Sequence, residues 1–244
     1  MQNNIVLILG SGPNAVQAGQ WGATAQNRHF DRIVAINNAW QVRPDWDFLI
    51  HPEDFPPARR PDTLQPAQKI VTADTYVAAQ NALGGFVYAG GTMAFTAAYW
   101  ALHTLAPKVL AFLGCDMVYP RSGPTHFYGT GTADPLRADV TLQHLPSKSA
   151  RLALKAAQTG CHCVNLSRDA SNLLFPRASL TDLETLCGTP TVALDQALID
   201  QAEACESSLG YFVPSGRYWE DSDRFSAAAL AKLDALWLKA YETC

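Results

Sequence analysis

Residues 6 to 15 read VLILGSGPNA, and this stretch decides the fold because four apolar residues stand directly before a glycine turn. An apolar run closed by Gly10-Ser11-Gly12-Pro13 is typical of a buried strand that leads into a helix. Glycines at such a turn permit positive φ angles and let another backbone or an anion approach closely. Two interpretations follow: the turn binds a phosphate group, or it only lets the chain reverse.

Five further runs rich in Val, Ile and Leu have the same character. They read IVAIN (33–37), FLIHP (48–52), KIVTA (69–73), VLAFLG (109–114) and CHCVNLS (161–167). Helical stretches are expected between them at 14–28, 92–105 and 147–159, with Gly160 closing the last one. This alternation predicts an α/β fold with a doubly wound, mostly parallel, Rossmann-like sheet.

The pattern changes after about residue 180. Helical segments are expected at 180–187, 192–207 and 226–241, and a loop with Pro214, Gly216, Tyr218 and Trp219 separates the last two. We therefore expect a nucleotide-binding α/β domain over residues 1–179 and a helical C-terminal extension packed on it over residues 180–244. One apolar stripe of the last helix would pack within the chain or form a homo-oligomer. It consists of Leu230, Leu233, Leu236, Trp237 and Tyr241.

Of the 244 residues, 48% are hydrophobic and 16% are charged, and the net charge is −4. This composition predicts a globular protein, and the lack of Lys and Arg runs argues against a nucleic-acid partner. No apolar stretch is long enough for a membrane span and the first residues lack a signal-peptide layout, so a cytoplasmic protein is expected. The six cysteines show no C-x-x-C spacing and are expected to be free thiols.

The glycine turn departs from the dinucleotide-binding fingerprint. Ala15 occupies the place of the third glycine, and Asn37-Asn38 follow the second strand where an acidic residue would contact a ribose. Pro13 also removes one backbone donor. The sequence therefore disfavours NAD, and it leaves open another nucleotide or phosphate ligand or a purely structural turn.

Ligands of open parallel sheets bind beyond the carboxyl ends of the strands, so polar residues there are candidate binding residues. Asn37 and Asn38 would contact a ribose, a base edge or a phosphate, or would bridge two loops. Gly91 and Thr92 stand before the apolar helix MAFTAAYWALHTL. They would expose N–H groups to an anion, or Thr92 would serve only as the helix N-cap.

A polar, glycine-rich loop follows the strand that ends at residue 113. It carries Asp116, Tyr119, His126 and Tyr128, which can act as acid, base or hydrogen-bond donor at the ligand edge, as in an active-site lid. We expect His126 to act as a general base and Asp116 to orient it or a sugar hydroxyl.

Two groups of acidic residues raise the question of a metal. His51-x-Glu53-Asp54 has suitable ligand types, but adjacent positions of an extended strand point to opposite faces. Asp45-Trp46-Asp47 matches the D-x-D motif of many nucleotide-sugar transferases, but it precedes its strand and so belongs to the opposite sheet edge. The sequence therefore predicts no metal ligand.

The order of these motifs resembles the bacterial sialyltransferases of glycosyltransferase family forty-two, over roughly residues 5–175. The similar features are a GxGP turn, a strand ending in Asn, a Thr-containing turn before an apolar helix, a strand ending in Gly-x-Asp and a His-aromatic-x-Gly loop. The related 6-hydroxymethylpterin diphosphokinase-like family shares the GxGP turn and the strand-end Asn.

The resemblance implies a Rossmann-like domain of the glycosyltransferase-A-variant type that uses a CMP-activated sugar without a metal or cofactor. It implies that Gly10, Ser11 and Gly12 approach the phosphate, that Asn37 contacts the nucleotide and that Thr92 replaces a donor-contacting serine. Ser11 stands where the family has an asparagine.

The same resemblance assigns roles to the loop. Tyr119 takes the part of a tyrosine that stabilises the departing phosphate, and Tyr128 is the other candidate for that role. The family's base is the second histidine of its motif, where this chain has Thr130, so His126 would have to remove the proton.

The sequence thus predicts a glycosyltransferase-like enzyme that binds a nucleotide or nucleotide-sugar and transfers the sugar to a small-molecule or glycan acceptor. One alternative is a magnesium-dependent pyrophosphokinase acting on a pterin-like alcohol, with Asp116, Glu53 and Asp54 as metal ligands. Another is a non-catalytic nucleotide-binding protein.

Overall fold

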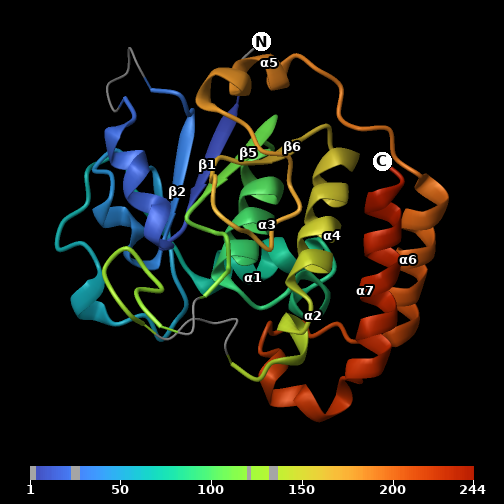
Figure 1. The fold of residues 1–244 in the computed structure, drawn as a ribbon. Coiled ribbons are helices and arrows are strands. Elements are labelled where there is room, and N and C mark those ends of the chain that lie inside the picture. Colours follow the sequence, from blue (N-terminus) through green and yellow to red (C-terminus); the bar gives the residue numbers. More distant parts are fainter. Residues whose placement is uncertain (1–3, 23–27, 120–121, 132–136) are drawn as a thin grey trace.

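The computed structural model describes residues 4–22, 28–119, 122–131 and 137–244 (Figure 1). Its centre is one sheet of six parallel strands in the order β4-β3-β2-β1-β5-β6. The strands are β1 Ile5–Leu9, β2 Arg32–Ile36, β3 Phe48–Ile50, β4 Lys69–Val71, β5 Val109–Leu113 and β6 His162–Asn165. The predicted parallel sheet and its six apolar runs are confirmed. The chain runs outward from β1 to β4 and returns to the other side of β1 as β5, so the strand order reverses between β1 and β5.

Seven α-helices and several short 3₁₀ helices connect or follow the strands in the described part of the chain. The α-helices are α1 Ala73–Ala82, α2 Phe86–Ala89, α3 Met93–Leu105, α4 Leu145–Gln158, α5 Leu183–Cys187, α6 Gln196–Leu209 and α7 Ala227–Glu242. The 3₁₀ helices are η1 Pro13–Gln20, η2 Asn37–Gln41, η3 Pro57–Arg59, η5 Val140–Leu142, η6 Leu180–Asp182 and η7 Tyr218–Arg224.

Each face of the sheet is covered by its own apolar core, because successive side chains of a strand point to opposite faces. Val6 and Ile8 of β1 face the core that contains α3, whereas Leu7 and Leu9 face the core that contains η1 and α5. Figure 1 shows η1, in blue, on one side of the strands and α3 and α4 on the other. The fold is therefore doubly wound, as predicted.

The structure differs from the sequence-based expectation in three elements. The helix expected at 14–28 is a 3₁₀ helix that ends at Gln20, and residues 23–27 lie outside the described residues. Helix α1 follows β4 directly, although no helix was expected at 73–82. Helix α6 begins only after Asp195, whose side chain accepts a hydrogen bond from the backbone N–H of Leu198 and so acts as the N-cap.

Helices α6 and α7 pack against each other and on α4, which lies between them and α3 (Figure 1). Helix α5 instead contacts β1 and β5 in the core on the other face of the sheet. Leu230, Leu233 and Trp237 of the predicted apolar stripe are buried in the same core as the strands. These three side chains pack within the chain and are not exposed for an oligomer contact.

Buried charged groups join α4 to these helices. The Arg151 guanidinium lies 2.6 Å and 2.8 Å from the two carboxylate oxygens of Glu206, which also accepts a 2.8 Å hydrogen bond from the indole of Trp237. Lys148 Nζ lies 2.9 Å from Asp234 of α7. Burial lowers the pKa of Lys148 below its ordinary value, and the opposing charge of Asp234 counteracts this effect.

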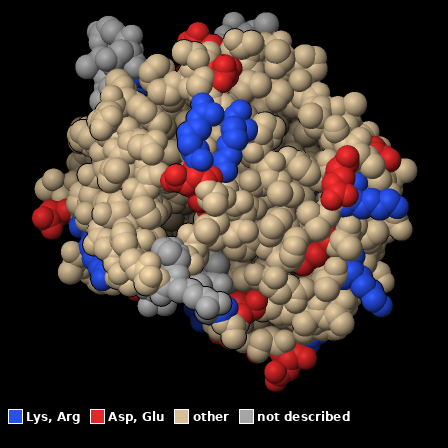
Figure 2. Space-filling model, in the orientation of Figure 1, with Lys and Arg blue, Asp and Glu red and all other residues tan. Residues whose placement is uncertain are grey.

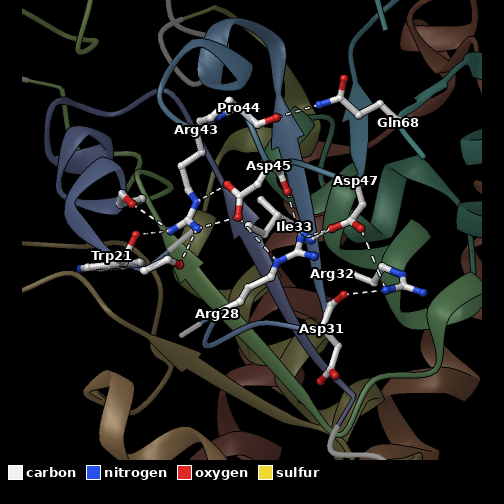
Figure 3. Close-up of polar contacts among 12 residues, drawn as sticks. Trp21, Arg28, Asp31, Arg32, Ile33, Arg43, Pro44, Asp45, Asp47 and Gln68 are labelled. Atoms are coloured by element: carbon white, nitrogen blue, oxygen red, sulfur yellow. Dashed lines mark hydrogen bonds and ion pairs between the residues drawn. The ribbon is translucent and has the colours of Figure 1, made fainter. Parts of the chain in front are cut away.

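At the amino edge of the sheet, Asp45 and Asp47 take part in ion pairs (Figure 3). Both carboxylate oxygens of Asp45 accept 2.8 Å hydrogen bonds from Arg43, whose side chain is buried. Asp47 pairs with Arg28 and accepts a 2.8 Å bond from the backbone N–H of Ile33. The D-x-D motif therefore fastens the chain before β3 to β2 and lies at the sheet edge opposite to the strand ends, as predicted.

The face of the molecule in Figure 2 carries few charged side chains, in keeping with the low charge content. No helix in the described residues is long and apolar enough to span a bilayer. All six cysteines are free thiols, as predicted.

We predict that Glu206→Gln destabilises the protein by about 3 kcal/mol or more, because the buried Arg151 charge loses its counter-charge. Chemical denaturation measures the free energy of unfolding. Glu203→Gln is the matched control on the same helix: its pair with Lys155 is partly exposed, so its loss should cost less than about 1 kcal/mol. Equal effects of the two changes would contradict a structural role for the buried pair.

Candidate functional site

The turns that follow β1 and β5 meet where the strand order reverses, which is the position at which open parallel sheets bind ligands. A cavity of about 100 Å³ lies there, and we call it the small cavity. Its lining includes six of the predicted site residues: Gly10, Ser11, Gly12, Asn37, Thr92 and Tyr119. Residues from four separate segments of the chain are thus brought together at the carboxyl edge of the sheet.

The glycines of the turn are required by the contact between β1 and β5. The backbone N–H groups of Gly10 and Gly12 each donate a 2.8 Å hydrogen bond, to Leu113 and to Gly114 respectively. A β carbon at Gly10 would collide with the Gly114 carbonyl, and one at Gly12 would lie 2.9 Å from the same oxygen. These two N–H groups are used by the sheet, so other groups would have to supply the donors for an anion.

Two of the four described non-glycine residues with positive φ angles lie at the small cavity. Asn37 and Met117 both line it, and both are non-glycine residues with positive φ angles, 52° and 53°. Such conformations cost free energy and persist where the surrounding structure enforces them, often at functional sites. Asn37 Oδ1 is also buried and accepts no hydrogen bond from the described residues. A ligand donor that reached this oxygen would satisfy it.

The N-terminus of α3 forms another part of the wall. Thr92 is the N-cap, as one interpretation predicted, and its Oγ1 accepts a 3.2 Å hydrogen bond from the N–H of Phe95. Thr92, Met93 and Ala94 all line the small cavity. The first N–H groups of a helix have no partner within the helix and carry a partial positive charge, so this wall favours an anion.

The predicted lid loop is attached to the glycine turn. The N–H of Phe127 donates a 3.0 Å hydrogen bond to the Ser11 carbonyl. Next to this anchor, the His126 ring stacks on Tyr128 with 4.9 Å between the ring centres, and the Tyr119 ring lies 6.3 Å from His126. Three of the four predicted catalytic side chains therefore form one aromatic cluster next to the small cavity.

The environment of His126 favours one tautomer. Its Nδ1 lies 2.9 Å from Thr125 Oγ1, and that hydroxyl donates to the Gly131 carbonyl at 3.2 Å. Because a hydroxyl has a single proton, the bond to Gly131 leaves Thr125 as the acceptor and Nδ1 as the donor. Nε2 then carries a lone pair, which is the form a general base needs.

Asp116 has other partners than the aromatic cluster. Its carboxylate accepts hydrogen bonds from Asn14 at 2.7 Å and from Asn165 at 3.0 Å, and Arg177 lies 3.8 Å away. These contacts connect the ends of β1, β5 and β6. Within the described residues Asp116 therefore acts as a structural bridge, and Thr125 is the group next to the imidazole nitrogen.

Cys115 lines the small cavity but is unsuited to act as a nucleophile. Burial raises the pKa of its thiol far above the ordinary value, and the neighbouring Asp116 carboxylate adds to this effect. The thiol therefore remains protonated.

Asn38 and Gly91 lie outside the lining of the small cavity. Asn38 is buried in η2. Gly91 lies beneath the Tyr218 hydroxyl, which occupies the space that a β carbon would need. Its N–H donates to Thr141 Oγ1 at 3.0 Å and its carbonyl accepts from Arg137 at 3.0 Å. The C-terminal segment therefore covers the turn in which the sequence suggested a phosphate contact.

The Tyr218 hydroxyl belongs to a hydrogen-bonded cluster around Asp139. It donates to Asp139 Oδ2 at 2.8 Å, and Arg137 and Thr141 donate to the same carboxylate. Burial alone would raise the pKa of Asp139, but the hydrogen bonds from Thr141, Tyr218 and Arg137 outweigh it and hold the pKa below its ordinary value. Burial, followed by the Asp139 charge, raises the pKa of Tyr218, so the phenol remains a neutral donor.

This cluster forms part of the wall of a second, larger cavity of about 740 Å³, which we call the large cavity. Met93 lines both cavities. The large cavity could not be recognised in the sequence, because its wall combines segments that are far apart along the chain. They are the residues after β3, α1, the loop before η5 and the segment 215–225. The only local indication of this cavity in the sequence is Tyr218-Trp219, two aromatic residues in a loop between two helices.

Among the described residues, no three His, Cys, Asp or Glu side chains lie close enough together to hold a metal ion. No protein-family model, curated protein or solved structure matches the chain. The candidate site therefore depends on its own geometry and chemistry.

We predict that Gly10→Ala lowers the free energy of unfolding by about 2–3 kcal/mol, because the new methyl group meets the rigid Gly114 carbonyl. Gly188→Ala is the control: the added carbon would lie 3.7 Å from its nearest neighbour, and a change within about 0.5 kcal/mol is expected. Chemical denaturation of both variants tests this, and a Gly10→Ala protein as stable as the control would contradict the close contact.

Proposed function

We propose that the protein is a metal-independent glycosyltransferase that uses a nucleotide-activated sugar of the CMP-sialic acid type. The observation that carries the proposal is the attachment of the aromatic loop to the glycine turn, with His126 and Tyr119 next to a cavity of phosphate size. The glycine turn departs from the dinucleotide-binding fingerprint at Ala15 and at Asn37.

The small cavity supports a donor with a single phosphate. Its volume of about 100 Å³ is sufficient to hold one phosphate group. The N-terminus of α3 would stabilise the phosphate charge. The described residues that line this cavity include no Asp or Glu, the ligands that magnesium prefers, and this favours a donor that needs no metal.

In the proposed reaction, an acceptor hydroxyl forms a bond to the anomeric carbon while the bond from that carbon to the phosphate oxygen breaks. The electron pair of the broken bond stays on the phosphate, where the Tyr119 phenol and the α3 N-terminus would stabilise the new charge. The acceptor proton moves to Nε2 of His126. No other co-reactant is needed.

We predict that CMP raises the melting temperature of the protein without added magnesium, because a ligand that binds only the folded state stabilises it.

His126→Ala should lower kcat for transfer or donor hydrolysis about 10²-fold to 10⁴-fold and leave CMP binding unchanged. Tyr119→Phe should lower kcat about 10²-fold. Thermal-shift assays and donor-turnover assays measure these effects.

His103→Ala and Tyr241→Phe are matched controls. His103 is exposed on α3, and the Tyr241 hydroxyl donates to the Leu174 carbonyl.

Stabilisation of the protein only by ATP with magnesium would support the pyrophosphokinase and contradict the glycosyltransferase. Binding of CMP without any turnover would support a non-catalytic nucleotide-binding protein, and no stabilisation by any nucleotide would leave the glycine turn with its structural role alone.

A further inference from the structure

The large cavity has no role in the proposed reaction centre, although it is the larger of the two cavities. Its volume is about 740 Å³, and its wall combines buried aromatic rings with exposed charged side chains, so it is an open cleft that a ligand can enter. The volume lies within the range of small-molecule sites. The cavity opens at the carboxyl edge of the sheet, between the end of β3, the start of α3 and the C-terminal segment.

Aromatic rings form much of its wall. Tyr76, Phe86 and Tyr218 are largely buried, with the Phe86 and Tyr218 rings stacked 6.1 Å apart and Tyr76 meeting Phe86 edge to face at 6.4 Å. Trp219 lies at the rim, packed edge-on against Tyr218, and is 59% exposed. The face of an aromatic ring carries negative partial charge, and a cation within about 6 Å of the ring centre is attracted to it.

The charged groups of the wall favour a cation as well. Of its two basic side chains, Arg137 is hydrogen-bonded to the half-buried Asp139 and to the Gly91 carbonyl. Arg217 lies 3.7 Å from Glu53 and 3.5 Å from Glu220, in exposed pairs of the kind that contribute little free energy. Glu53 is 64% exposed at its side chain, and Asp54 follows it along the wall.

The field of these two carboxylates reaches into the cavity. Burial is the largest cause of the raised pKa of Tyr76, and the charges of Glu53 and Asp54 raise it further. An anionic ligand would be repelled by this field, and a cationic one would be attracted. Aromatic faces beside carboxylates form the setting in which proteins recognise ammonium groups, and here a cationic ligand would compete with Arg217 for Glu53.

We propose that the large cavity is a binding site for a small organic ammonium compound, with the cationic group held by Glu53, Asp54 and the face of Trp219. This inference is independent of the proposed function, because the site shares only Met93 with the small cavity. If both proposals hold, the two ligands lie on either side of the α3 N-terminus, and the ammonium compound is the candidate acceptor.

The test compares pairs of compounds that differ in charge and little in shape. Choline is compared with 3,3-dimethyl-1-butanol and glucosamine with glucose, by isothermal titration calorimetry and by the NMR signal of the Trp219 indole N–H. At least one cation should bind saturably and at least about tenfold more tightly than its neutral counterpart. Raising the salt concentration should weaken this binding, since the carboxylates are exposed.

Variants then locate the site. Glu53→Gln combined with Asp54→Asn should weaken binding of the cation at least about tenfold, and Trp219→Leu about threefold to tenfold, whereas Trp219→Phe keeps an aromatic face and most of the affinity. Glu184→Gln, on α5 and outside the cavity, is the control and should change nothing. These side chains are exposed, and near-wild-type melting temperatures would verify that the variants fold.

The inference is overturned if neither cation binds, if the neutral compounds bind equally well, or if the Glu53 and Asp54 changes leave affinity unaltered. CMP binding, measured on the same variants, distinguishes the two proposals. Cation binding without nucleotide binding would support this site and contradict the proposed function, and the reverse result would contradict this site alone.

Discussion

Gly10 and Gly12 lie against the backbone of Gly114 so closely that β carbons at these positions would collide with it. This contact joins the ends of β1 and β5, the two strands between which the chain reverses its direction of sheet growth. Beyond it the two loops remain connected, because Asn14 of η1 donates a hydrogen bond to Asp116. The small cavity lies beside this contact and is lined by both loops.

A second constraint acts from the opposite end of the chain. The buried charges of Arg151 and Glu206 hold α6 against α4, and the Trp237 indole adds a bond from α7. From this fixed platform the segment before α7 extends back to the sheet edge, where Tyr218 lies over Gly91 and donates to Asp139. The start of α3 is therefore held by residues more than a hundred positions away in sequence.

The two cavities have different chemistry. The described lining of the small cavity carries helix N–H groups, amide and hydroxyl groups but no carboxylate, which suits an anion. The large cavity has aromatic walls and carboxylates at its rim. Met93 lines both cavities, so ligands bound in them would lie on either side of the α3 N-terminus.

Local patterns in the amino-acid sequence were enough to predict the strands, the start of α3 and part of the candidate site. The apolar runs predicted six strands, because strands buried on both faces need unbroken hydrophobic stretches. Thr92 before an apolar segment predicted the N-cap of α3 as one of two interpretations. The polar residues predicted after the strands and before α3 make up half of the lining of the small cavity.

Only the tertiary structure decided how the polar residues are used. Asp116 contacts Asn14 and Asn165, which lie 102 and 49 residues away, and no spacing in the sequence could distinguish this bridge from a role beside His126. Position 91 requires a glycine because the Tyr218 hydroxyl occupies the space of a β carbon. The large cavity is assembled from segments that are distant in sequence. Local sequence specifies the hydrophobic periodicity of each helix or strand and the residues at which it ends. Side-chain partners and cavities arise from packing between elements, which local patterns do not encode.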